Sequence, residues 1–179
     1  VYISGQVLNF PEGKTLQVSY TKFVEDEHVK LQFTPDSMGN FEMRIPVINS
    51  TRMYLYYFMQ GNIGTLFAEP GEKIGIHSDW EKGTLTFSGE HAQSHQEVYD
   101  YGRYVDSLSL SRPNESYIDE RISHEECLRL LTAEWTQNDS LLNVYRQKRP
   151  EMSNRAVAQV QAMNQNSFAF KLMQRRFML

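Results

Sequence analysis

Residues 66–76, LFAEPGEKIGI, contain the turn that decides how the first half of this chain folds. Pro70 and Gly71 occupy the second and third positions of this turn, and a type II turn needs a positive φ at the third position, which glycine adopts without strain. Ile74 and Ile76 follow at two-residue spacing, which is typical of a strand with one buried face. The segment therefore predicts a tight turn that leads into a β-strand.

The same alternation of apolar and polar residues continues through the first half of the chain. It predicts further strands around residues 16–20, 29–33, 41–45, 53–59 and 85–87. Turn-forming residues separate these runs, including Glu12 and Gly13 and the segment DSMGN at residues 36–40. Seven or eight short strands with short connections predict an antiparallel β-sandwich, with an open barrel as the alternative.

The second half of the chain has a helical composition. Nine of the ten glycines lie at or before Gly89. Ser94 and Glu97 match a capping box, and apolar residues at helical spacing follow from Val98. Two further helical patterns cover residues 118–150 and 153–179. The predicted fold class is α+β, with a β-sandwich at residues 1–90 and a segment of three to four helices at residues 91–179 that packs on it.

Composition excludes several classes of protein. The chain has 179 residues, of which 40% are apolar and 22% charged, and these values fit a globular protein. The net charge of −4 argues against nucleic acid as a partner. No apolar run is long enough to span a membrane. The single cysteine, Cys127, excludes a disulfide framework, a CxxC redox motif and a multi-cysteine zinc site.

Motifs for catalysis or metal binding are weak. His91 and His95 have the spacing of a helical metal pair, but the capping box leaves His91 outside the helix. His124 begins HEE without the second histidine of a zinc motif, because Leu128 takes that position. Cys127 fits a small buried apolar residue, and a cryptic enzyme centred on it is the alternative. We therefore predict no catalytic residue, no metal and no cofactor.

The strand at residues 53–59 is apolar on both faces, so something should cover each face. The helical half is the simplest cover. The alternative is a platform for a sugar or another ring. In that case Tyr54, Tyr56 and Trp80 are the predicted ligand-binding residues.

The last predicted helix ends in an apolar stretch without a stop signal, and we expect the chain to continue beyond it. Phe170, Met173 and Phe177 are the predicted interface residues, because flexible and aromatic apolar side chains are common at interfaces. The expected partner is a following domain or a second copy of the chain. The alternative is a terminal helix packed fully on its own sheet.

Four segments together carry a family resemblance. They are residues 3–7 (ISGQV), 39–43 (GNFEM), 66–76 (LFAEPGEKIGI) and 85–89 (LTFSG), and a predicted helix follows the last of them. In this order they resemble the N-terminal domain of unknown function of Bacteroidetes thioredoxin-like proteins. These proteins are exported, often lipid-anchored relatives of thiol:disulfide oxidoreductases and of the AhpC/TSA group. The resemblance covers about residues 1–100, and the helical half is similar only in layout.

The resemblance implies a non-catalytic accessory domain in the periplasm or at the outer membrane. Its implied partners are a C-terminal thioredoxin-like domain of the same polypeptide, a client protein or a second copy, with a lipid anchor upstream of Val1. Because CxxC is absent from this sequence, no catalytic residue is carried over. A carbohydrate- or small-ligand-binding sandwich remains the alternative function.

Overall fold

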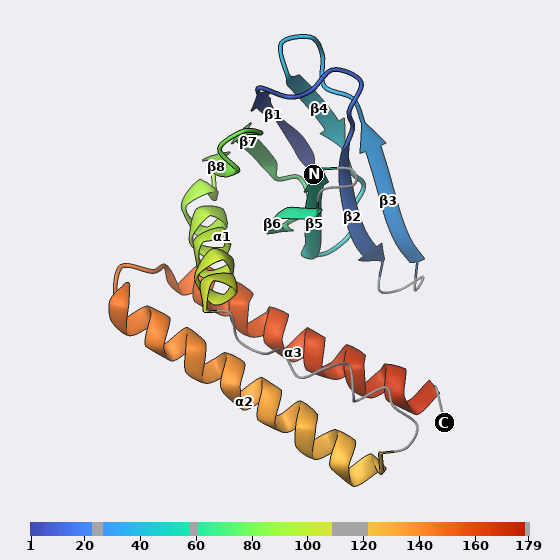
Figure 1. Ribbon diagram of the computed structural model, residues 1–179, viewed down its shortest axis with the longest axis vertical. Coiled ribbons are helices and arrows are strands. Elements are labelled where there is room, and N and C mark those ends of the chain that lie inside the picture. The colour runs from blue at the N-terminus through green and yellow to red at the C-terminus, as the bar shows by residue number, and fades with distance from the viewer. Residues whose placement is uncertain (23–26, 58–60, 109–121, 178–179) are drawn as a thin grey trace. The chain divides into compact units, whose positions relative to one another are not determined.

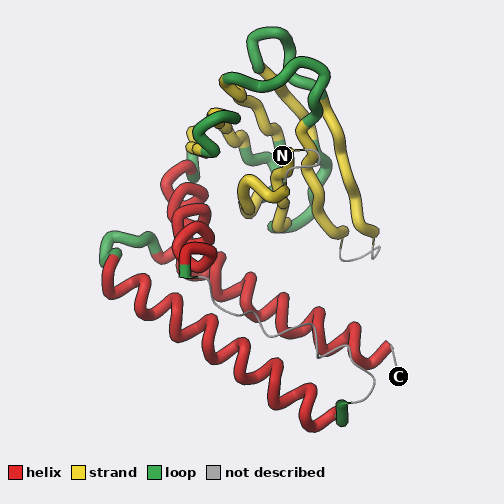
Figure 2. Tube along the Cα trace, in the orientation of Figure 1, coloured by secondary structure: helices red, strands yellow, loops and turns green. Residues whose placement is uncertain are grey.

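A computed structural model describes residues 1–22, 27–57, 61–108 and 122–177 of the chain. The chain forms two compact units, Val1–Gly102 and Arg103–Leu179. The described residues contain eight strands, all in the first unit, and three helices (Figures 1 and 2). The predicted mixed α+β composition is therefore confirmed.

The strands form two four-stranded sheets, with the orders β4-β1-β7-β8 and β3-β2-β5-β6. The strands are β1 (Tyr2–Leu8), β2 (Leu16–Lys22), β3 (Glu27–Phe33), β4 (Asn40–Arg44), β5 (Thr51–Tyr57), β6 (Gly61–Ala68), β7 (Lys73–Asp79) and β8 (Thr84–Gly89). The predicted turn at residues 69–72 joins β6 of one sheet to β7 of the other.

One strand pair corrects the prediction of a purely antiparallel architecture. β1 lies between β4 and β7, and it runs antiparallel to β4 but parallel to β7, with Ile3 opposite Ile74. The other described pairs are antiparallel. The alternation of apolar residues shows which face of a strand is buried. This alternation is the same in parallel and antiparallel pairs, so it could not predict that β1 and β7 run parallel.

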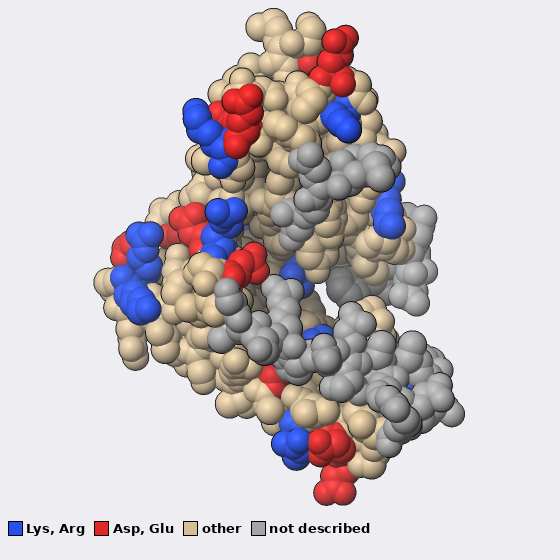
Figure 3. All heavy atoms as spheres, in the orientation of Figure 1, with Lys and Arg blue, Asp and Glu red and all other residues tan. Residues whose placement is uncertain are grey.

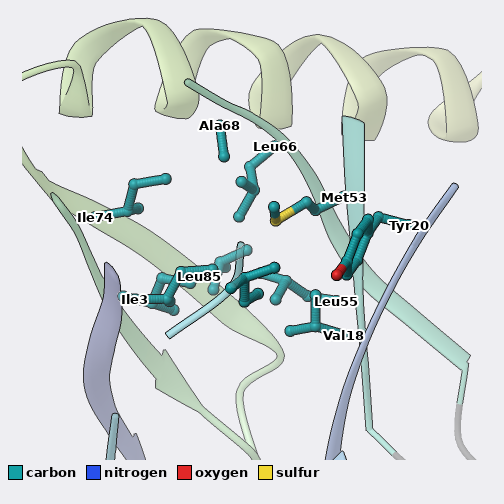
Figure 4. Packing of buried hydrophobic residues seen from close by; sticks show 11 residues of the cluster. Ile3, Val18, Tyr20, Met53, Leu55, Leu66, Ala68, Ile74 and Leu85 are labelled. Atoms are coloured by element: carbon teal, nitrogen blue, oxygen red, sulfur yellow. The ribbon is translucent and has the colours of Figure 1, made fainter. Parts of the chain in front are cut away.

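Side chains from both sheets form one apolar core. Residues at two-residue spacing on β5 show the pattern clearly, because Met53, Leu55 and Tyr57 are buried while Tyr54 and Tyr56 are half-buried. Figure 4 shows the core side chains Ile3, Val18, Tyr20, Met53, Leu55, Leu66, Ala68, Ile74 and Leu85.

Helix α1 (Ala92–Ser107) begins earlier than the capping box predicts. The backbone N–H of His95 donates to the carbonyl of His91 at 3.1 Å, so the first helical turn starts there. Ser94 lies inside that turn, where its hydroxyl donates to the same carbonyl at 3.0 Å. The predicted cap at Ser94 is therefore wrong, because the upstream carbonyl of His91 already closes a helical turn.

The second unit contains an antiparallel pair of helices, α2 (His124–Lys148) and α3 (Asn154–Phe177). Ser123 caps α2 by accepting a hydrogen bond from the backbone N–H of Glu126 at 3.1 Å. The seam between the helices contains the ring pair Trp135–Phe168, with centroids 5.4 Å apart, and an ion pair between Lys171 and Glu134. Both helices lie within the predicted helical patterns, but α2 begins only at His124, and residues 118–121 and 178–179 lie outside the described residues.

Surface charge agrees with the small net charge. On the face shown in Figure 3, acidic and basic side chains lie among one another over both units. No described helix combines the length and the apolar character that crossing a bilayer requires.

Candidate functional site

The outward face of β5 carries three planar side chains in a row. Arg52, Tyr54 and Tyr56 alternate with the core residues of the strand, so they point away from the core. All three are half-buried. Their neighbours across the sheet include Phe67 on β6, which lies opposite Arg52, and Ser19 on β2, which lies opposite Tyr54.

These three side chains stack along the strand. The guanidinium carbon of Arg52 lies over the ring of Tyr54, 4.6 Å from its centroid. The rings of Tyr54 and Tyr56 follow with centroids 6.2 Å apart and an interplanar angle of 31°. We call Arg52, Tyr54 and Tyr56 the β5 stack. A cation on an aromatic face is attracted by the negative charge above the ring, so the stack orients the guanidinium.

Burial controls the electrostatics of the β5 stack. It lowers the pKa of the Arg52 guanidinium below its usual value, although the phenols of Tyr54 and Tyr56 oppose this change. Burial also raises the pKa of the Tyr54 phenol, against the opposing effect of Arg52. At neutral pH Arg52 is therefore cationic and Tyr54 keeps its phenolic proton.

Arg52 has no anionic partner within the described part of the chain. Its Nε atom is buried without a hydrogen-bond acceptor, and its one polar contact is the ring of Tyr54. Sequence reasoning selected Tyr54 and Tyr56 for their rings but missed Arg52. The signal that could have found it is a charged residue two positions before Tyr54, on the same face of an otherwise aromatic strand.

The structure places Trp80 apart from the β5 stack. Its ring packs on Tyr57 with centroids 4.5 Å apart and on Phe10 at 5.4 Å. Tyr57 lies on the core face of β5, where its hydroxyl and that of Ser78 are 2.5 Å apart. Of the three predicted ligand-binding residues, the structure therefore brings together Tyr54 and Tyr56 only.

Two hollows among the described residues differ in size and shape. A space between the sheets, lined by Phe33, Phe41 and Ser78 among others, measures about 10 Å³ and would hold about one water molecule. A larger, open hollow of about 730 Å³ lies along α2 and is lined by Leu128, Thr136 and their neighbours on that helix. It is the surface of a single helix and is not an enclosed site.

A buried hydrogen-bonded pair joins the turn at residues 69–72 to α1. His95 Nε2 lies 2.8 Å from Glu72 Oε1, and the side chains of both residues are almost fully buried. The other carboxylate oxygen of Glu72 accepts the backbone N–H of Glu69 at 2.8 Å. Burial raises the pKa of Glu72, but hydrogen bonds from His95 and Glu69 outweigh it, and the pKa lies below its usual value.

The two histidines at the spacing of a helical metal pair have separate roles. His95 binds Glu72, and its Nδ1 is buried without a partner, whereas His91 supplies the first carbonyl of α1. Across the described ranges, no group of three or more His, Cys, Asp and Glu side chains could hold a metal ion. The Glu72–His95 pair is too deeply buried to meet a substrate, so we assign it to stability.

Cys127 lies on the buried side of α2 and is fully buried, whereas His124 is exposed at the start of the helix. A thiol that attacks a disulfide must be accessible to it. The burial of Cys127 therefore favours its interpretation as a small apolar core residue.

Two of the three predicted interface residues are exposed on α3. Phe170 is 53% and Met173 is 55% exposed. Each lies two positions after a residue of the seam, Phe168 and Lys171, which places it about 200° around the helix. They therefore lie on the side of α3 that faces away from α2. The side chain of Phe177 lies outside the described residues.

Comparison with known proteins found no matching family model, no matching curated protein and no matching solved structure.

Proposed function

We propose that this chain is a non-catalytic interaction domain of an exported thioredoxin-like protein, and that it positions a redox domain or a client protein. The observation that carries this proposal is the apolar face of α3 formed by Phe170 and Met173. In this proposal the two sheets form a sandwich that provides a rigid base. The resemblance of residues 1–100 to N-terminal domains of such proteins supports the same function.

The composition of this face suits a protein partner. A phenylalanine and a methionine supply a large, adaptable contact area. Among the side chains that the structure describes, their exposed neighbours Asn166 and Ala169 carry no charge. We name Phe170 and Met173 the α3 face. In the isolated chain, we expect a second copy to occupy it.

Sedimentation velocity tests the α3 face. We expect the chain to self-associate with increasing concentration, and the double variant Phe170→Gln with Met173→Gln to remain monomeric with a nearly unchanged melting temperature. Exposed surface substitutions usually change stability by less than about 0.5 kcal/mol.

Ile48→Gln is the matched control for this experiment, because Ile48 is 83% exposed but lies in the first unit, between β4 and β5. It should self-associate like the unchanged chain. A monomeric unchanged chain would count against the proposal. So would a large fall in melting temperature in the double variant, because that fall would show that the face packs within its own chain.

The coding sequence downstream of the Leu179 codon tests the second part of the proposal. A reading frame that continues into a thioredoxin-like domain with CxxC would support it. A stop codon directly after Leu179 would contradict the expected redox partner in the same polypeptide.

The β5 stack favours a second candidate function. Two neighbouring tyrosine rings and a cation lie on the outer face of this strand, and all three side chains are half-buried. We propose, as the alternative, that this surface binds a small ligand with a ring, such as a sugar or an aromatic compound. Tyrosines suit this role because each combines a flat apolar face with a polar hydroxyl group.

A further inference from the structure

Arg52 determines which chemical class of ligand the β5 stack would bind. We infer that the stack binds a ring that carries a single carboxylate, with the carboxylate on the guanidinium of Arg52 and the ring beside Tyr54 and Tyr56. This inference rests on the alternative function proposed above, and it is independent of the α3 face.

Within the described residues, the Nε atom of Arg52 is buried without an acceptor, so a carboxylate that reaches this guanidinium would meet its two terminal nitrogens. A guanidinium that stacks face-on uses its flat surface on the ring, and its N–H donors point outward in the guanidinium plane. The guanidinium carbon of Arg52 lies over the Tyr54 ring at 4.6 Å, a distance that allows this arrangement. A carboxylate approaching in that plane can accept two parallel hydrogen bonds, which is the strongest geometry that arginine offers an anion.

The unpaired charge of Arg52 favours an anion over a neutral ligand. Within the residues that the structure describes, the side chain of Arg52 forms neither a hydrogen bond nor an ion pair, although it is half-buried. A partly desolvated cation without a counter-ion is costly, and an arriving carboxylate would remove most of this cost. A neutral ring would cover the same surface but leave the charge unpaired.

The charge of the β5 stack matches a monoanion. Arg52 is its single cation, and Tyr54, whose pKa burial raises, keeps its phenolic proton at neutral pH. A phosphate monoester carries nearly two negative charges at pH 7 and would leave part of its charge unmatched. A carboxylate carries one, so it matches the single guanidinium.

Isothermal titration of the whole chain with benzoate and benzamide tests this inference, because the two probes have nearly the same shape and differ in charge. We expect benzoate to bind at least about tenfold more tightly, which is the range for a hydrogen-bonded charge pair. Glucuronate and glucose form a second pair of probes and show whether the preferred ring is aromatic or a sugar.

Arg52→Gln should lower the affinity for benzoate about tenfold and change that for benzamide less than twofold. Arg44→Gln is the matched control, because Arg44 is exposed on β4 and its loss changes net charge by the same amount. It should leave both affinities unchanged. Tyr54→Leu should weaken both probes, because it removes the ring that both would contact.

Two outcomes would overturn the inference, and they differ in whether the ring-binding function is retained. Equal binding of benzoate and benzamide, unaffected by Arg52→Gln but weakened by Tyr54→Leu, would retain the ring-binding function and reject the carboxylate. No heat of binding for any of the four probes at millimolar concentration would reject both the carboxylate and the ring-binding function.

Discussion

Glu72→Ala should lower the free energy of unfolding of the first unit by about 3–5 kcal/mol, the usual cost of removing one partner of a buried ion pair. The substitution leaves the Nε2 atom of His95 without its partner at a buried position. It also removes the acceptor of the Glu69 N–H and leaves a void. Because Glu72 ends the β6–β7 turn and His95 lies in α1, the loss should loosen the attachment of the helix to this turn. Urea denaturation followed by circular dichroism measures the change.

A double-mutant cycle separates the ion pair from general packing. His95→Ala and the double variant with Glu72→Ala complete the cycle, and we expect a coupling energy of at least about 1.5 kcal/mol between the two positions. Glu72→Gln is the conservative control, since an amide oxygen can still accept a hydrogen bond, and it should cost less than Glu72→Ala. Additive losses in the cycle would show that the pair makes no specific contribution.

The pH dependence of stability provides a second measurement of the same pair. The pKa of Glu72 in the folded protein is lower than its usual value of 4.5, so the folded state favours the ionised carboxylate. This contribution to stability is fully present above about pH 4.5 and is lost as the pH falls through the folded pKa. The stability difference between the unchanged chain and Glu72→Gln should therefore shrink as the pH falls below about 4.5. A difference that grows on acidification would contradict the assignment.

Gly39→Ala should lower the free energy of unfolding by about 2–5 kcal/mol, from the left-handed backbone and a steric clash together. Gly39 lies in the turn before β4 with φ +79°, and a Cβ atom added there would lie 2.1 Å from the carbonyl oxygen of Val7. That atom belongs to the backbone of β1 and cannot move aside like a flexible side chain. The carbonyl of Gly39 also accepts the N–H of Val7 at 2.9 Å, so a displaced turn would lose this hydrogen bond.

Gly13→Ala is the matched control for the Gly39 substitution. Gly13 has φ +73°, but no atom lies within 4 Å of the added Cβ. This variant should therefore show the cost of the left-handed backbone alone, about 1–2 kcal/mol. The difference between the two variants in urea denaturation measures the clash with β1. Equal losses would show that the turn adapts and that the close approach to Val7 is unimportant.

The candidate site was predictable only in part. Tyr54 and Tyr56 were accessible to sequence reasoning because residues two apart on a strand share a face. Sequence reasoning could not single out Arg52, because its lack of a hydrogen-bond acceptor among the described residues depends on every segment that the fold brings near it. Trp80 shows the opposite case. It was grouped with the tyrosines as an aromatic residue, but the fold packs it on Phe10 and Tyr57 at the core face.

Local patterns in the sequence determined the α+β composition, most strand and helix positions, and the turn at residues 69–72, because these depend on residues only a few positions apart. Tertiary structure alone decided the parallel pairing of β1 with β7, whose paired residues are about 70 positions apart along the chain. It also decided the pairing of Glu72 with His95. Hydrophobic periodicity shows which face of an element is buried. It contains no information about which distant element covers that face, since many partners can bury the same apolar surface and only packing of the whole chain selects one.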